Sequence, residues 1–226
     1  MTGNLLVWVF AASFLGFAIS AIFAGWMKLS RNRFLVSYVI LAAIFLYSFV
    51  LANHLDLRAI LTENLVWGFL TGMLVSIFLV INVKSQPASR QSEGAKLAFD
   101  ITWPGFIYGL VDALFLNVMP VVAVFLATAQ LPWTGSLLGK VIVAILALVA
   151  SLLVTLTYHL GYPEFRNKRV LMVLVGNSLI TLAYLVSGNP FGSLISHSVM
   201  HMAAVLQGPE TTIQLPPHHR PYFELG

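Results

Sequence analysis

The chain has 226 residues, of which 59% are hydrophobic and only 9% are charged, and it contains no cysteine. A soluble domain is about 25% charged, so these charges could not cover the surface of a water-soluble globule of this length. The absence of cysteine excludes disulfides, thiolate metal sites and a cysteine nucleophile. The net charge of +4 is explained by basic loop residues that orient helices, and it does not predict nucleic acid as a partner.

Seven apolar segments follow one another along the chain, each long enough or nearly long enough to cross about 30 Å of hydrocarbon. Because backbone polar groups must be satisfied inside lipid, these segments predict helices. They cover residues 5–26, 34–52, 65–83, 104–128, 138–160, 170–187 and 191–206. The predicted fold is an all-α, polytopic transmembrane helix bundle of about seven helices in a lipid bilayer. The short seventh helix is expected to be buried among the others.

A polar stretch between the third and fourth segments divides the predicted bundle. Residues 1–83 are expected to form a peripheral three-helix part, and residues 104–208 a four-helix core. Between them, residues 84–103 predict a flexible cytoplasmic linker that ends in an interfacial segment, with Trp103 at headgroup level. Residues 209–226 form a tail that is rich in proline and histidine and has no apolar period.

The basic residues are distributed unevenly over the predicted connections. Of the 12 lysines and arginines, only Arg58 and Lys140 fall on one side of the predicted membrane, and the other ten fall on the opposite side. Cytoplasmic connections carry an excess of lysine and arginine. The pattern therefore predicts an inner-membrane protein with its N-terminus outside and its C-terminus in the cytoplasm.

Four ionisable residues lie inside the predicted spans at similar depth: Asp112, His159, His197 and His201. Such groups are expensive in a membrane and are functional candidates by default. The i, i+4 spacing of His197 and His201 places both imidazoles on one helix face. Such a pair can hold a divalent metal or can place two hydrogen-bonding groups around one reacting oxygen. The sequence thus predicts one buried site near the cytoplasmic side.

Other polar and small residues of the spans have weaker implications. Asn117 lies five residues after Asp112, so it need not share that face of the helix. Asn177 is either a hydrogen-bonding contact between helices or a member of the site. Gly105 and Gly109 allow close packing of the fourth span against a neighbour.

Three stretches are similar to motifs of the CPBP family of intramembrane proteases, which includes CAAX prenyl endopeptidases and bacteriocin-immunity or abortive-infection proteins. Together they cover roughly residues 104 to 208, and their order and spacing fit the family. They are Gly109-Leu-Val-Asp112-Ala-Leu-Phe115 at the place of Glu-Glu-x-x-Phe-Arg-Gly, Leu156-Thr-Tyr-His159-Leu at Phe-x-x-x-His, and Asn189-Pro-Phe-Gly-Ser-Leu-Ile-Ser-His197-Ser-Val-Met-His201 at the closing His-x-x-x-Asn helix.

The resemblance implies that Asp112 falls at the second family glutamate, which helps to activate water. His159 and His197 match the two family histidines, which with the asparagine stabilise the oxyanion, and His201 replaces that asparagine. The chain departs from the family where Val111 stands at the first glutamate and Leu116 at the arginine. One aspartate with three histidines is closer to a metal-ligand set, with a divalent metal such as zinc as the candidate cofactor.

The first functional hypothesis is therefore an intramembrane, protease-like hydrolase that acts on a peptide or membrane-protein substrate. Asp112 would be base or metal ligand, and the three histidines would be oxyanion donors or metal ligands. The second hypothesis is a non-catalytic accessory subunit among partner membrane subunits, which binds a metal, haem or chlorophyll through histidine. A transporter with a proton relay is disfavoured, because no inverted repeat is visible. A structural role, with Asp112 simply bonded to a histidine, also stays open.

Overall fold

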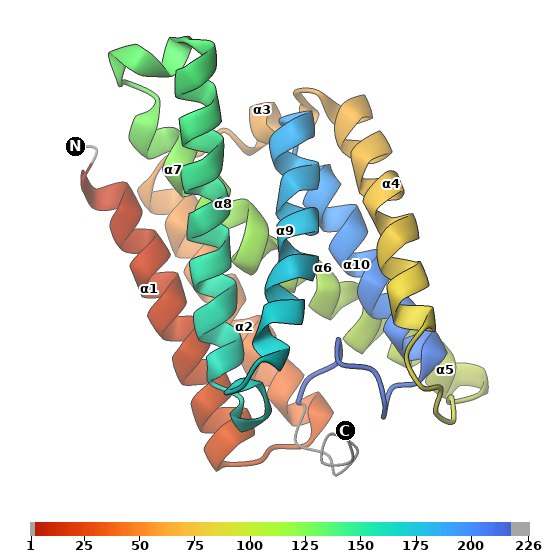
Figure 1. The fold of residues 1–226 in the computed structure, drawn as a ribbon. Coiled ribbons are helices and arrows are strands. Elements are labelled where there is room, and N and C mark those ends of the chain that lie inside the picture. Colours follow the sequence, from red (N-terminus) through yellow and green to blue (C-terminus); the bar gives the residue numbers. More distant parts are fainter. Residues whose placement is uncertain (1–2, 218–226) are drawn as a thin grey trace.

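The structure, a computed structural model, describes residues 3–217, and over this range the chain forms helices and no strand (Figure 1). The predicted all-α fold is confirmed. The first half consists of α1 (Gly3–Ile19), η1 (Ser20–Trp26), α2 (Arg31–Ala52), α3 (Leu57–Thr62) and α4 (Leu65–Lys84). The second half consists of α5 (Gly94–Asp100), η2 (Ile101–Ile107), α6 (Tyr108–Ala113), η3 (Leu114–Val118), α7 (Met119–Thr128), η4 (Pro132–Gly135), α8 (Leu137–Leu160), η5 (Pro163–Phe165), α9 (Arg169–Ser187) and α10 (Phe191–Gln207).

Six helical stretches of the described chain are long and apolar enough to cross a membrane. They are Leu5–Trp26, Arg31–Ala52, Leu65–Lys84, Gly94–Thr128, Leu137–Leu160 and Arg169–Ser187. Large apolar side chains cover their outer faces, with Phe14 on α1 75% exposed and Leu74 on α4 69% exposed. Apolar surface of this extent is stable only against lipid. The chain is therefore an integral, multi-pass membrane protein.

The seventh predicted helix, α10, has only 17 residues and is shorter than these six. It packs against α4 on one side, against η2 and α6 on another, and against α9 (Figure 1). Among its buried positions are His197 and His201. The short last helix therefore lies among the others, and it carries two histidines into the interior.

The first three spans do not pack together as a separate part. α1 packs mainly against α7 and α8, whereas α4 packs mainly against α10 and α9. The expected division into a peripheral part of residues 1–83 and a core of residues 104–208 is thus not a boundary of packing. Helices from both halves of the sequence surround α10.

Glycines set the distance between α10 and its neighbours. Gly68 and Gly72 on α4 face the start of α10, where a Cβ on Gly72 would lie 2.9 Å from the carbonyl oxygen of Phe191. Gly105 and Gly109 face the second half of α10, where a Cβ on Gly109 would lie 2.8 Å from Cα of Ser198. Small residues four apart allow helix backbones to approach closely in lipid. Both α4 and the η2–α6 stretch therefore approach α10 closely through a pair of glycines.

The turn between α9 and α10 is hydrogen-bonded to the end of α3 and to the residue that follows it. Gly188 ends α9 in the left-handed conformation, with φ of 68°, which glycine adopts without strain. The side-chain amide of Asn189 donates hydrogen bonds to the carbonyls of Leu61 and Glu63, at 3.1 and 2.6 Å. These bonds fix the position at which α10 starts.

The polar stretch after α4, which the sequence predicts to be a flexible linker, makes hydrogen bonds to the end of α10 and to the tail. The amide of Gln207 donates to the carbonyl of Gln86 at 2.8 Å, and the backbone N–H of Ser89 donates to the carbonyl of Gln207 at 3.3 Å. The backbone N–H of Ile213 donates to the side-chain oxygen of Gln86 at 3.0 Å. The first part of the tail, to residue 217, therefore packs onto residues 85–93.

The segment before Pro104 and the end of the tail were also predicted from the sequence. The expected interfacial segment before Pro104 is part of one continuous helical run, Gly94–Thr128, and Trp103 packs partly buried against the core. The rest of the predicted tail, residues 218–226 with Arg220, lies outside the described residues.

We expect Gly192→Ala to lower the stability of the bundle by about 1–3 kcal/mol, because an added methyl would overpack the α9–α10 contact. A Cβ at Gly192 would lie 2.5 Å from the carbonyl oxygen of Ala183, an atom of the α9 backbone. Thermal unfolding of the detergent-purified protein measures the change. Gly176→Ala on α9 is the matched control, because a Cβ there meets nothing within 4 Å. Equal melting temperatures for the two variants would contradict this account of the contact.

Candidate functional site

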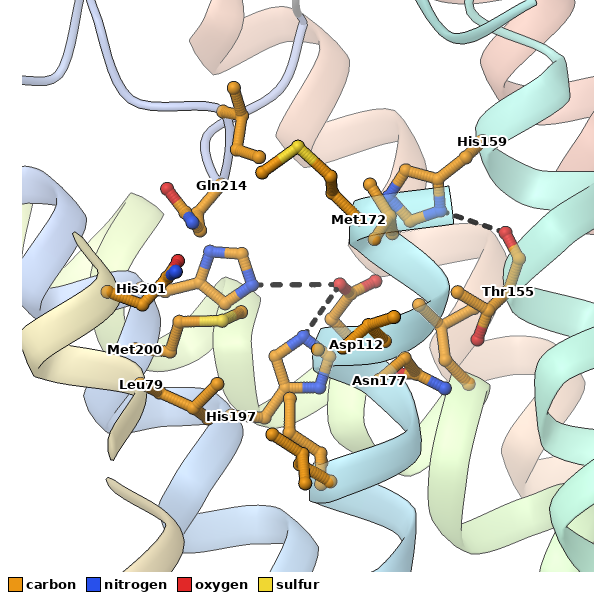
Figure 2. A pocket seen from close by; sticks show the side chains of 18 of the residues that line it. Leu79, Asp112, Thr155, His159, Met172, Asn177, His197, Met200, His201 and Gln214 are labelled. Atoms are coloured by element: carbon orange, nitrogen blue, oxygen red, sulfur yellow. Dashed lines mark hydrogen bonds and ion pairs between the residues drawn. The ribbon is translucent and has the colours of Figure 1, made fainter. Parts of the chain in front are cut away.

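A cavity of about 320 Å³ lies inside the bundle, between α4, α6, α8, α9 and α10 (Figure 2). All four residues that the sequence singled out line it: Asp112, His159, His197 and His201. Most of the remaining wall is apolar. Among the described residues that line the cavity there is no lysine or arginine. Any charge in the cavity must therefore be balanced by the histidines or by a bound group.

Asp112, on α6, is the centre of the cluster and only 3% of its surface is exposed. One carboxylate oxygen, Oδ1, accepts a hydrogen bond of 2.6 Å from the hydroxyl of Tyr38 on α2. The other, Oδ2, lies 3.3 Å from Nε2 of His197 and 3.7 Å from Nε2 of His201. Ligand-type atoms of these three residues all lie within 4.8 Å of one another.

The two imidazoles come from consecutive turns of α10 and face the same carboxylate oxygen. Their rings are nearly parallel, with 13° between the planes and 5.0 Å between the centroids. Gly109 makes this approach possible, because a Cβ there would lie 3.1 Å from Cδ2 of His201 and 3.3 Å from the carbonyl oxygen of His197. A larger residue would push α10 away from the helix that carries Asp112.

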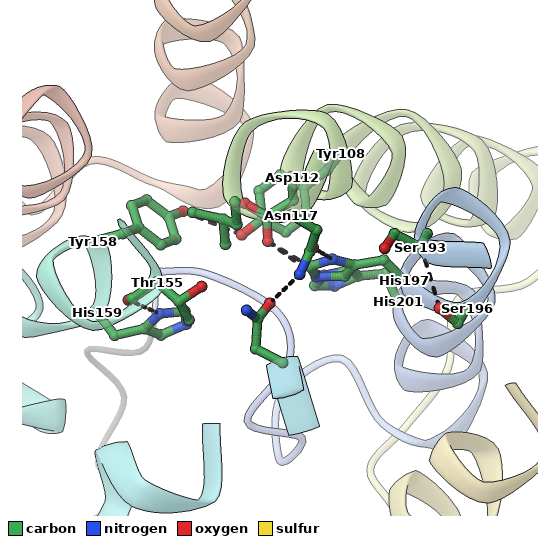
Figure 3. A network of polar contacts seen from close by, with 12 residues as sticks. Tyr108, Asp112, Asn117, Thr155, Tyr158, His159, Ser193, Ser196, His197 and His201 are labelled. Carbon is green, nitrogen blue, oxygen red and sulfur yellow. Dashed lines mark hydrogen bonds and ion pairs between the residues drawn. The ribbon is translucent and has the colours of Figure 1, made fainter. Parts of the chain in front are cut away.

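Asn117 belongs to the site, although its spacing from Asp112 did not require the two residues to share a helix face. Its side-chain oxygen lies 3.0 Å from Nδ1 of His197 (Figure 3). Asn117 is in η3, a π-helical turn with i to i+5 hydrogen bonds. In an α-helix five residues rotate the chain well past a full turn, but the wider π turn brings residue i+5 back toward the face of residue i. Asp112 and Asn117 therefore hold opposite edges of one imidazole.

A chain of buried hydrogen bonds behind Asn117 starts at a proline. Pro120 has no N–H to give to the carbonyl of Leu116, four residues earlier. That carbonyl instead accepts a hydrogen bond of 2.7 Å from the hydroxyl of Ser151 on α8. The Ser151 oxygen in turn accepts from the amide of Asn177 on α9, at 3.2 Å. Asn177 is thus a contact between helices that also belongs to the site's support.

These hydrogen bonds determine which ring nitrogen of His197 carries its proton. The amide of Asn177 donates to Ser151, so its oxygen must accept the 2.8 Å bond from the amide of Asn117. The oxygen of Asn117 is then left as the acceptor for His197. Nδ1 of His197 therefore donates, and the neutral ring presents the lone pair of Nε2 to Asp112.

His201 differs from His197 in having no such support. It is 2% exposed, and neither ring nitrogen has a hydrogen-bond partner. The 3.7 Å separation from Asp112 is within ion-pair range but too long for a hydrogen bond. Buried side-chain nitrogens normally have a partner, so a buried imidazole of this kind, next to a cavity, is the most unusual group of the site.

His159 lies apart from the other three residues. It reaches the cavity from α8, on the side away from α10 (Figures 2 and 3). Its Nδ1 donates to the backbone carbonyl of Thr155 at 2.8 Å, which leaves Nε2 as the acceptor of the neutral ring. The predicted set of four thus becomes a cluster of three with one histidine on another part of the cavity wall.

Tyr38 is the second residue that the sequence did not indicate. It is fully buried, on a helix that was expected to be peripheral. Three more buried tyrosine hydroxyls form a chain nearby, from Tyr162 to Tyr158 at 2.7 Å and on to Tyr108 at 3.1 Å. Tyr47 lies in the same span and is exposed, so a tyrosine in an apolar segment is too weak a signal to have identified Tyr38.

Comparisons with known proteins identify no relative of this chain. No protein-family model matches the chain, and no curated protein or solved structure gives a significant match. The site must be interpreted from its own geometry.

We expect Nδ1 of His197 to carry a proton in every charge state of the ring, because Asn117 offers it only an acceptor. Nitrogen NMR of histidine-labelled protein measures this, and loss of the signal in His197→Gln assigns it. Asn117→Leu should release the ring and let the proton exchange between the two nitrogens. A bare Nδ1 in the unmodified protein would contradict the order of the hydrogen-bond chain.

Proposed function

We propose that this chain is an intramembrane, protease-like hydrolase with its reaction centre at Asp112, His197 and His201. The observation that carries the proposal is the meeting of a buried carboxylate and two imidazoles in the wall of a cavity of about 320 Å³. Such groups are costly inside a bundle and cluster where chemistry needs them. The similarity of three sequence stretches to the CPBP family supports the same class of reaction.

In this proposal Asp112 takes the proton of the attacking water at Oδ2, the carboxylate oxygen that faces the imidazoles. Its other oxygen is occupied by Tyr38, which fixes the direction of the carboxylate. His201, whose ring nitrogens are not used elsewhere, donates to the developing oxyanion. His159 presents the lone pair of Nε2 to the cavity, where it accepts the proton that Asp112 has taken from water and passes it to the leaving group.

The proposal places this chemistry near the cytoplasmic side of an inner membrane. The helix ends and connections at one end of the bundle carry nine of the described basic residues: Lys28, Arg31, Arg33, Lys84, Arg90, Lys96, Arg166, Lys168 and Arg169. The other end carries Arg58 and Lys140. By the excess of basic residues in cytoplasmic connections, the end of α10 faces the cytoplasm, and the start of α1 lies on the opposite side (Figure 1).

Asp112→Asn is expected to lower the rate of hydrolysis by about 10²–10⁴-fold, because the amide cannot take a proton from water. His197→Ala is expected to have a comparable effect. The assay uses proteoliposomes, synthetic peptides with one apolar segment, and water labelled with ¹⁸O. Mass spectrometry then detects one labelled oxygen in each new carboxyl group.

The matched control is Asp100→Asn, which makes the same change in the same helical run. Asp100 bonds to Ser92 and Lys96 outside the central cavity, so its variant should keep full activity. Activity retained in both Asp112→Asn and His197→Ala would overturn the proposed reaction centre.

A second candidate function is a non-catalytic accessory subunit that binds a cofactor through histidine. The unpartnered nitrogens of His201 favour it, because a buried imidazole without a hydrogen bond is suited to ligate a metal or a pigment. Val111 and Leu116, at the places of two charged family residues, favour it too. A pigment or stoichiometric partner subunits that purify with the chain would distinguish it from the hydrolase.

A further inference from the structure

We propose that Asp112, His197 and His201 form a binding site for one first-row divalent transition metal such as zinc, which Tyr38 and Asn117 orient. The proposal goes beyond hydrolysis and does not require it, because it concerns only what these side chains bind. It assigns His159 no place among the ligands.

The distances within the cluster fit a single small cation. Nitrogen and oxygen ligands lie about 2.0–2.2 Å from zinc, so in a tetrahedral site they lie roughly 3.3–3.5 Å from one another. Nε2 of His197 is 3.3 Å from Oδ2 of Asp112, and Nε2 of His201 is 3.7 Å from the same oxygen. The ligand atoms of the three residues all lie within 4.8 Å of one another, and one imidazole would have to turn from its nearly parallel neighbour for all three to contact one ion.

The hydrogen-bond chain prepares His197 as a ligand. Its Nδ1 proton is committed to Asn117, so the neutral ring directs a lone pair from Nε2 toward a carboxylate oxygen. Two acceptors at 3.3 Å repel unless a cation lies between them, and the cation is either a proton or a metal. Ligating histidines usually donate their other N–H in this way, which fixes the ring and raises its basicity.

The carboxylate has the same kind of support. Tyr38 bonds to Oδ1 of Asp112 at 2.6 Å and leaves Oδ2 to face both imidazoles. Two of the three ligands thus have an outer partner that holds them in a ligating orientation. Packing alone would not require these side chains to direct a carboxylate oxygen and two ring nitrogens toward one point.

The surroundings of His201 and the charge of Asp112 in the cavity also favour a bound metal. The ring is buried without a hydrogen-bond partner for either nitrogen, and no lysine or arginine in the described chain lines the cavity to balance Asp112. A divalent cation would satisfy His201 and offset the charge of the carboxylate, and a hydroxide at the open position would offset its second charge. Two imidazoles with one carboxylate suit zinc and its neighbours in the first transition row better than magnesium or calcium.

Three protein ligands leave a fourth position for water. The cluster lies in the wall of the cavity, so that position would face the space in which a substrate would bind. Zinc lowers the pKa of a bound water to about 7. In a hydrolase the ion would itself activate the water, in place of Oδ2 of Asp112 and the ring of His201, which it would occupy.

The experiment is a metal titration of untagged, chelator-treated protein in detergent, with His218→Gln and His219→Gln in every sample so that the tail contributes no ligands. Zinc binding is measured by calorimetry and by elemental analysis after gel filtration. Cobalt(II) is the spectroscopic probe, because its visible absorption reports tetrahedral nitrogen and oxygen ligands. Magnesium is the control ion.

We expect one zinc per chain and a rise in melting temperature with zinc, because binding to the folded state stabilises it. Asp112→Asn and His201→Gln should abolish stoichiometric binding, and Tyr38→Phe and Asn117→Leu should weaken it about 10–100-fold, as changes to outer partners do. His159→Gln is the matched control, a histidine of the same cavity outside the cluster, and should bind zinc like the parent.

Zinc binding that is absent from the parent, or that survives unchanged in Asp112→Asn and His201→Gln, would overturn the proposal and leave a proton between Asp112 and His197. Dependence of binding on His159 would overturn the three-residue ligand set. The isosteric Asp112→Asn and Tyr38→Phe variants guard against loss of folding, and their unfolding curves without metal verify it. Stoichiometric zinc without peptide hydrolysis would refute the proposed hydrolase and keep the metal site.

Discussion

The close approach of α10 to its neighbours is the constraint on which the rest of the structure depends. Gly109 brings α10 against α6, and Gly72 brings it against α4, with no side chain between the backbones. In lipid there is no hydrophobic force between helices, so contacts of this kind and interhelical hydrogen bonds hold a bundle together. The same approach carries His197 and His201 to Asp112. The contacts that hold α10 in the bundle therefore also bring the residues of the site together.

Departures from regular helix geometry supply the rest of the site. The π-helical turn η3 brings Asn117 toward the face of Asp112, and Pro120 frees the carbonyl of Leu116 for Ser151. Each would be a defect in an isolated helix, because it breaks the regular ladder of hydrogen bonds. Inside the bundle, neighbouring helices satisfy the freed groups. The irregular stretch thereby becomes the anchor of a hydrogen-bond chain that ends at His197.

The pattern of satisfied and unsatisfied polar groups sets the centre of the site apart from its support. Asn117, Asn177, Ser151 and Tyr38 all have partners. His201 has no hydrogen-bond partner and only the 3.7 Å ion-pair contact with Asp112, although it is as deeply buried. A fully bonded outer layer around an inner group without partners is expected where a ligand completes the bonding. This contrast favours a binding or reaction centre over an ion pair that serves packing alone.

The sequence by itself determined the all-α membrane fold and singled out Asp112, His197 and His201, because span length and the rise per residue of a helix follow from the chain alone. It also placed the two histidines on one face of α10. Only the tertiary structure decided that His159 lies apart, that Asn117 and Tyr38 join the site, and that residues 85–93 are held by the tail. Those outcomes depend on how helices rotate, bend and pack against one another. A local sequence pattern predicts position along a helix axis, but not which neighbour a given face will meet.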